Sequence, residues 1–195
     1  LVILYAVTIA LMTVLPFRIA LLGEPAEAFG GMYVASQAAN VMKVILSFGT
    51  AIVLLMAEPW LKTEGNRHEG EFYLLVLSTL LGMFIMMSSG NFLLFFLGLE
   101  TASVPLACMV AFDKWKKNSA EGAAKYILVA TFSSGVMLYG ISFIYAAAGT
   151  LYFDDVAAAL AALMGGQLVE TACGATALQS PALAIMGLVF FFSGL

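Results

Sequence analysis

Glu100 is the residue with the clearest chemical potential. It is the one charged residue in the apolar stretch NFLLFFLGLETASVPLACMVAF, residues 91–112. A carboxylate in such a segment must meet a cation or internal water, or it must hold its proton. Each arrangement suits a group that takes up and releases protons, and the alternative is a structural polar contact between helices. Pro105 cannot donate a backbone hydrogen bond to the carbonyl of Thr101, so it loosens the helix close to this glutamate.

Lys125 is the second candidate for proton transfer. It lies in the segment SAEGAAKY, about 9 Å along a helix that starts at Ser119. A buried ammonium and a buried carboxylate stabilise each other's charged forms, so moving or neutralising one alters proton binding by the other. Lys125 also follows Glu121 by four residues. The alternative is therefore a local ion pair near the membrane surface.

Two other charges lie near apolar segments. Arg18 is four residues from the end of its segment, and its long side chain reaches the membrane surface from there. Lys43 follows the polar sequence ASQAAN. If the helix begins near Asn40, Lys43 lies at the membrane interface, and it stays a weak candidate for function.

The elements that position these residues are membrane spans. Hydrophobic residues make up 63% of the 195-residue chain and charged residues 10%, whereas soluble domains carry about 25% charge. A span needs about 20 mostly apolar residues. We predict an all-α polytopic membrane helix bundle forming a single transmembrane domain. It has five full spans and the cut-off start of a sixth, at about 1–22, 33–57, 71–88, 92–112, 119–148 and 182–195. The chain begins and stops inside apolar runs, so we expect a fragment.

Basic residues alternate between the two sides of the predicted bundle. The loops after the second and fourth spans contain Lys62, Arg67, Lys114, Lys116 and Lys117. The other three loops contain no Lys or Arg, and two of them carry the acidic residues Glu24, Glu27, Asp154, Asp155 and Glu170 instead. This asymmetry predicts that the basic loops are cytoplasmic. It fits a multi-pass membrane protein.

Several classes of function lack their sequence signals. The chain has no basic patch for nucleic acid and no GxGxxG turn for a dinucleotide. Cys108 and Cys173 show neither a disulfide framework nor a metal-ligand spacing, and His68 lies in a polar loop. We therefore expect no catalytic residue, no metal and no cofactor site in this chain. Any redox chemistry must belong to partner subunits.

Three motifs carry a resemblance to a known family. They are FLGLE followed by Pro105, then SAEGAAKY, and then FSSGVMLYGISFIYAAAGT. Over about residues 28–195 the chain resembles the antiporter-like membrane subunits of respiratory complex I. Within that family it is most similar to the N subunits of bacterial NADH-quinone oxidoreductase.

The resemblance implies a fold and site residues. These subunits have about fourteen spans, arranged as two inverted five-helix repeats that each contain a broken helix. Glu100 matches the family's buried glutamate on the fifth span, and Lys125 matches a lysine on the sixth. A further lysine, on the broken seventh span, would lie past Leu195. An Asp-Pro pair that is frequent in the family is missing from YVASQAANVMK, so no role is carried over to Lys43.

The resemblance also implies a function and a location, the bacterial inner membrane. These subunits move protons across the membrane, driven by quinone reduction elsewhere in an NADH:quinone oxidoreductase. The quinone, NADH, FMN and iron–sulfur clusters are bound by partner subunits, and the chain itself contacts other membrane subunits and the lipid bilayer. Two alternatives are an Mrp-type cation/proton antiporter subunit without redox coupling and a membrane subunit that serves assembly alone.

Overall fold

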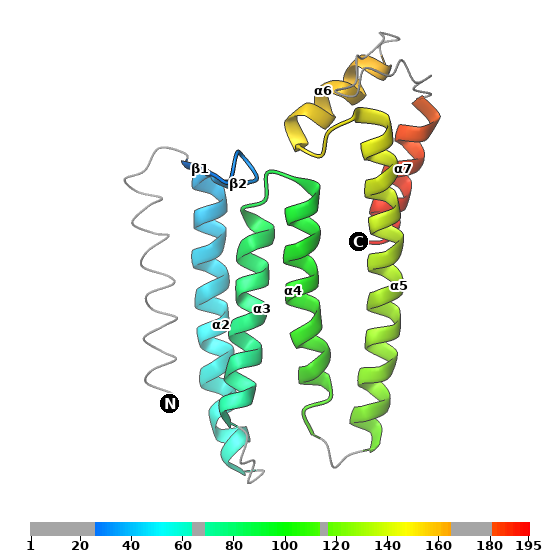
Figure 1. The fold of residues 1–195 in the computed structure, drawn as a ribbon. Helices are drawn as coiled ribbons and strands as arrows, with labels where there is room; N and C mark the ends of the chain where they lie inside the picture. Colours follow the sequence, from blue (N-terminus) through cyan, green and yellow to red (C-terminus); the bar gives the residue numbers. More distant parts are fainter. Residues whose placement is uncertain (1–25, 64–68, 114–116, 165–180) are drawn as a thin grey trace.

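The computed structural model describes residues 26–63, 69–113, 117–164 and 181–195. Within these ranges it contains six helices and one short hairpin (Figure 1). The hairpin strands are β1 (Ala26–Ala28) and β2 (Tyr33–Ala35), and the helices are α2 (Gln37–Thr63), α3 (Glu69–Met87), α4 (Phe92–Val110), α5 (Lys117–Ala148), α6 (Phe153–Met164) and α7 (Pro181–Ser193). The expected span at 1–22 lies outside the described residues.

Four of these helices have the length and composition to cross a membrane. They are α2, α3, α4 and α5, and α7 is a shorter apolar helix. Their outer faces are apolar: Phe132 on α5, for example, is 76% exposed. Apolar faces of this kind are stable against lipid or against neighbouring subunits, because exposing them to water is unfavourable. The predicted all-α membrane bundle is therefore confirmed.

The start of the second predicted span is a correction. We expected a helix from Tyr33, but residues 33–35 form strand β2, which pairs antiparallel with β1. The turn between the strands has positive φ angles at Phe29, Gly30 and Gly31. Glycine adopts such angles at little cost, so the chain reverses here and the helix begins only at Gln37.

The hairpin, the turn between α3 and α4, and helix α6 lie at one end of the bundle, here called the hairpin end (Figure 1). At this end the Asn91 side chain caps α4, because its oxygen accepts a hydrogen bond of 2.8 Å from the Leu93 amide. Helix α6 has 12 residues, which is too short for a span.

Close glycine contacts hold the helices together. A Cβ atom added to Gly82 of α3 would lie 2.5 Å from the Ala102 nitrogen of α4, and one added to Gly98 would lie 2.6 Å from the Met86 nitrogen. Small residues of this kind allow backbones to approach closely, which is the usual packing mode of membrane helices. The α3–α4 contact therefore fixes the helix that carries Glu100.

Candidate functional site

Glu100 lies near the middle of α4 and is partly buried. No residue in the described part of the chain forms an ion pair or a hydrogen bond with its carboxylate. The Ser103 hydroxyl donates to the Glu100 backbone carbonyl at 3.2 Å, and the Thr101 hydroxyl donates to the carbonyl of Leu97 at 2.7 Å. These neighbouring hydroxyls are thus occupied by the helix backbone, and the carboxylate stays available for water or for a partner on another chain or segment.

Pro105 is buried inside α4, and the helix continues through it to Val110. The proline has no N–H for the carbonyl of Thr101, so one backbone bond of the helix is missing within a turn of Glu100. The effect is local and does not break the helix.

Lys125 lies on α5 and pairs with Glu121. Its ammonium nitrogen is 2.6 Å from a carboxylate oxygen of Glu121, and the two side chains are 72% and 66% exposed. The local pair expected from the four-residue spacing is therefore present. In this structure Lys125 does not contact Glu100.

Lys43 is a buried cation, whereas the sequence pattern placed it at the membrane interface. Only 4% of it is exposed. Its ammonium donates to the Tyr33 hydroxyl at 3.0 Å and to the Ser88 hydroxyl, and it lies 5.1 Å from the centre of the Tyr33 ring. The hairpin covers Lys43, so a position near the helix end is enclosed by protein rather than by the membrane interface.

A sequence signal for this burial exists. Asn40, Lys43 and Ser47 are spaced by three and four residues, which places them on one face of a helix. All three are buried, at 5%, 4% and 0% exposure. Polar residues that repeat at helical spacing on an otherwise apolar helix indicate a polar face turned toward protein.

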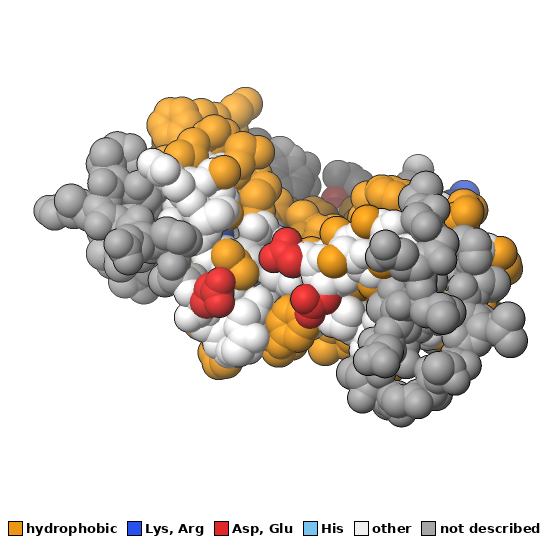
Figure 2. Space-filling model, turned by 90° about the horizontal axis from the view of Figure 1, so that it is seen from above, with side chains coloured by type: hydrophobic (Ala, Val, Ile, Leu, Met, Phe, Trp, Pro, Cys, Tyr) orange, Lys and Arg blue, Asp and Glu red, His pale blue; other side chains and the backbone are white. Residues whose placement is uncertain are grey.

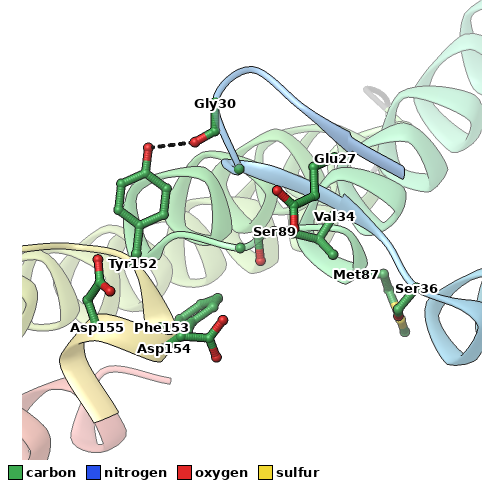
Figure 3. A pocket seen from close by; sticks show the side chains of 12 residues that line it. Glu27, Gly30, Val34, Ser36, Met87, Ser89, Tyr152, Phe153, Asp154 and Asp155 are labelled. Atoms are coloured by element: carbon green, nitrogen blue, oxygen red, sulfur yellow. Dashed lines mark hydrogen bonds between the residues drawn. The ribbon is translucent and has the colours of Figure 1, made fainter. Parts of the chain in front are cut away.

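An acid-lined cavity of about 560 Å³ opens at the hairpin end. Three carboxylates line it, from Glu27 on β1 and from Asp154 and Asp155 on α6 (Figure 3). Acidic side chains are also evident when the molecule is seen from this end (Figure 2). The Tyr152 hydroxyl donates to the carbonyl of Gly30 at 3.1 Å, which ties the start of α6 to the hairpin.

Tyr33 has a perturbed acidity. Burial alone raises the pKa of its hydroxyl, but the hydrogen bonds with Ser88 and Lys43 and the positive charge of Lys43 lower it, and the pKa ends below its usual value of 10.0. The phenol therefore gives up its proton more readily than a free tyrosine.

Comparison with known proteins places this arrangement in a family. Residues 89–195, which include Glu100, Pro105 and Lys125, match the family model described as NADH:quinone oxidoreductase/Mrp antiporter, transmembrane. The chain belongs to this family. The match covers more than half of the chain.

Relatives within the NADH:quinone oxidoreductase/Mrp antiporter family are named NADH-quinone oxidoreductase subunit N. The protein of Phocaeicola vulgatus is 56% identical over 173 residues, which cover 88% of this chain and 33% of that protein. The protein of Azobacteroides pseudotrichonymphae is 45% identical over 170 residues, which cover 87% of this chain and 32% of that protein. The chain thus spans about a third of the length of these relatives.

Solved structures of respiratory complexes share the fold. A chain of respiratory complex I from Thermus thermophilus with bound Aureothin matches with a TM-score of 0.69 and 24% identity, over 97% of this chain and 36% of that chain. A chain of the archaeal membrane-bound sulfane sulfur reductase matches with a TM-score of 0.70 and 20% identity, over 97% of this chain and 37% of that chain. At these identities the likeness concerns the fold alone.

Proposed function

We propose that this chain is part of a proton-translocating subunit N of a bacterial NADH:quinone oxidoreductase. Membership in the family and 56% identity to a protein named as subunit N support this assignment. Other membrane subunits of the complex surround the chain, and the quinone, NADH, FMN and iron–sulfur clusters belong to those partners. The bundle lies in the inner membrane with the Thr63 end of α2 facing the cytoplasm.

The observation that carries the proposal is Glu100, a carboxylate near the middle of an apolar helix with no partner among the described residues. An ionised carboxylate is poorly solvated there, so its charge depends strongly on what approaches it. A cation or water that reaches Glu100 favours loss of the proton, and withdrawal of that group favours its return. The missing backbone bond at Pro105 makes the adjoining turn easier to deform.

Lys125 is the proposed partner on the neighbouring helix. The Ser119 hydroxyl of α5 donates to the carbonyl of Val110 of α4 at 2.6 Å, which aligns the two helices at this level. Glu100 is ten residues from Val110 and Lys125 six residues from Ser119, so their axial positions differ by about 6 Å. An extended lysine spans about that length. Lys125 must leave Glu121 and the helices must shift for the two charges to meet, and this exchange of partners modulates proton binding at Glu100.

The test uses the full-length subunit in the assembled complex. Glu100→Gln keeps the shape and removes the ionisable group, so proton uptake into inverted vesicles should fall strongly while the complex still assembles. Glu100→Asp should retain part of the uptake, because the carboxylate persists. Thr101→Val is the control, since it removes a neighbouring polar group whose hydrogen bond stays within α4. Normal proton uptake in an assembled Glu100→Gln complex would reduce Glu100 to a structural contact.

A cation/proton antiporter without redox coupling is the second candidate, because the family model also covers Mrp antiporters. Quinone dependence separates the two functions. If proton movement by the complex persists when quinone reduction is inhibited, the antiporter assignment holds.

A further inference from the structure

The buried ammonium of Lys43 has an unusual set of neighbours. It offers three N–H donors, and the two acceptors that the structure gives it, Tyr33 and Ser88, are neutral hydroxyls. Within the described ranges no carboxylate forms an ion pair with it. A buried charge without a counter-charge is costly.

The two hydroxyl partners of Lys43 belong to segments that border the acid-lined cavity. Ser88 is followed by Ser89 and Gly90, which line the cavity, and Tyr33 is followed by Val34, which also lines it. The backbone ties these segments together, because the Val34 amide donates to the Ser88 carbonyl at 2.8 Å. Both hydroxyl partners of the ammonium are thus one residue along the chain from residues that line the cavity.

Further buried polar side chains lie deeper in the bundle than Lys43. Ser47, one turn further along α2, is fully buried, and its hydroxyl donates to the Lys43 carbonyl at 2.8 Å. Thr79 on α3 is also buried. Of the two described side chains that contact the Lys43 ammonium, Tyr33 is ionisable and Ser88 does not ionise between about pH 4 and 10.

We propose that Lys43 is a proton-exchange site at the mouth of the translocation path. The Lys43 ammonium gives its proton to the oxygen of Tyr33 or Ser88 while that hydroxyl passes its own proton to water in the cavity. The products are a neutral amine and a hydronium ion, which the carboxylates of Glu27, Asp154 and Asp155 attract; loading runs in reverse. This inference rests on the proposed function and adds a protonatable group outside the segment that contains Glu100.

The competing account is a fixed clamp, in which the Lys43 charge only ties the hairpin to the end of α3. The two accounts differ in one requirement. A clamp needs a permanent cation that donates hydrogen bonds, whereas a proton-exchange site needs a cation that loses its proton. Arginine satisfies the first requirement and not the second, because it stays charged at all accessible pH values.

The experiment compares variants of the full-length subunit in assembled complexes, with proton uptake measured per quinone reduced over a series of pH values. Lys43→Arg should assemble and support electron transfer, but it should lose most of its proton uptake and the pH dependence contributed by the lysine. Tyr33→Phe keeps the ring and removes the hydroxyl, so part of the uptake should be lost. Tyr145→Phe, on the exposed side of α5, is the matched control and should behave like the parent.

Two outcomes overturn the inference. Parent-like uptake and pH profile in Lys43→Arg would show that Lys43 is a clamp. If the larger arginine prevents assembly, the double variant Tyr33→Phe/Ser88→Ala decides, because it removes both hydroxyls that contact the ammonium; parent-like uptake in that variant would exclude the exchange. Glu100→Gln is measured in the same assay. If Glu100→Gln does not lower proton uptake, the proposed function is contradicted. If Glu100→Gln lowers uptake and Lys43→Arg does not, only the exchange site at Lys43 is contradicted.

Discussion

Adding one methyl group between α3 and α4 should destabilise the protein measurably. In Gly82→Ala the new Cβ would lie 2.5 Å from the Ala102 nitrogen and 2.8 Å from the Gly98 oxygen, whereas ordinary contact begins at 3.4 Å. Both neighbours are backbone atoms and have no rotamer to change. The helices must therefore separate locally by the difference of 3.4 and 2.5 Å, about 0.9 Å. Overpacking of this size costs about 1–3 kcal/mol.

The matched control is Gly135→Ala on α5, where nothing lies within 4 Å of the added Cβ. Both changes raise helix propensity by about 1 kcal/mol, so the difference between the two variants isolates the clash. The free energy of unfolding of the full-length protein in detergent should be about 1–3 kcal/mol lower for Gly82→Ala than for Gly135→Ala. Equal stability of the two variants would refute the close α3–α4 contact.

Three further predictions address the ends of the bundle and the α5 ion pair. A single cysteine at Asn66 should resist labelling by an impermeant reagent from the periplasmic side, because the basic loops are expected in the cytoplasm; strong labelling there would reverse the orientation. Tyr152→Phe removes the 3.1 Å hydrogen bond to Gly30, so hydrogen exchange in the hairpin should accelerate about fivefold, as expected for about 1 kcal/mol. Unchanged exchange would show that the bond contributes nothing. Lys125→Ala should lower proton uptake less than Glu100→Gln does, because the exposed lysine also pairs locally with Glu121; an equal or larger loss would make Lys125 the dominant site.

The sequence was most informative where the signal is local. Long apolar runs between polar loops predict α3, α4 and α5 within a few residues of their observed bounds, because a backbone in lipid must satisfy its hydrogen bonds within a helix. The Glu121–Lys125 pair follows from helical spacing alone. Glu100 was also recognisable, since a single charge in an apolar helix is conspicuous.

Contacts between segments that are far apart along the chain could not be predicted from the sequence. The burial of Lys43 depends on Tyr33 from the hairpin and on Ser88 from the end of α3, 45 residues away. Strand β2 falls at the start of a predicted span, because Tyr33 and Val34 continue the apolar pattern of α2. The glycines that allow α3 and α4 to touch looked like any other small residues, since only the packing reveals which backbone they approach.

The central claim is that Glu100 binds and releases a proton during turnover. The most direct measurement is an infrared difference spectrum of the assembled full-length complex, recorded between its oxidised and reduced states. We expect a carbonyl band of a protonated carboxylic acid that shifts in deuterated water, disappears in Glu100→Gln and moves in Glu100→Asp. A spectrum that is unchanged in Glu100→Gln would show that the carboxylate keeps one protonation state throughout, and it would contradict the account.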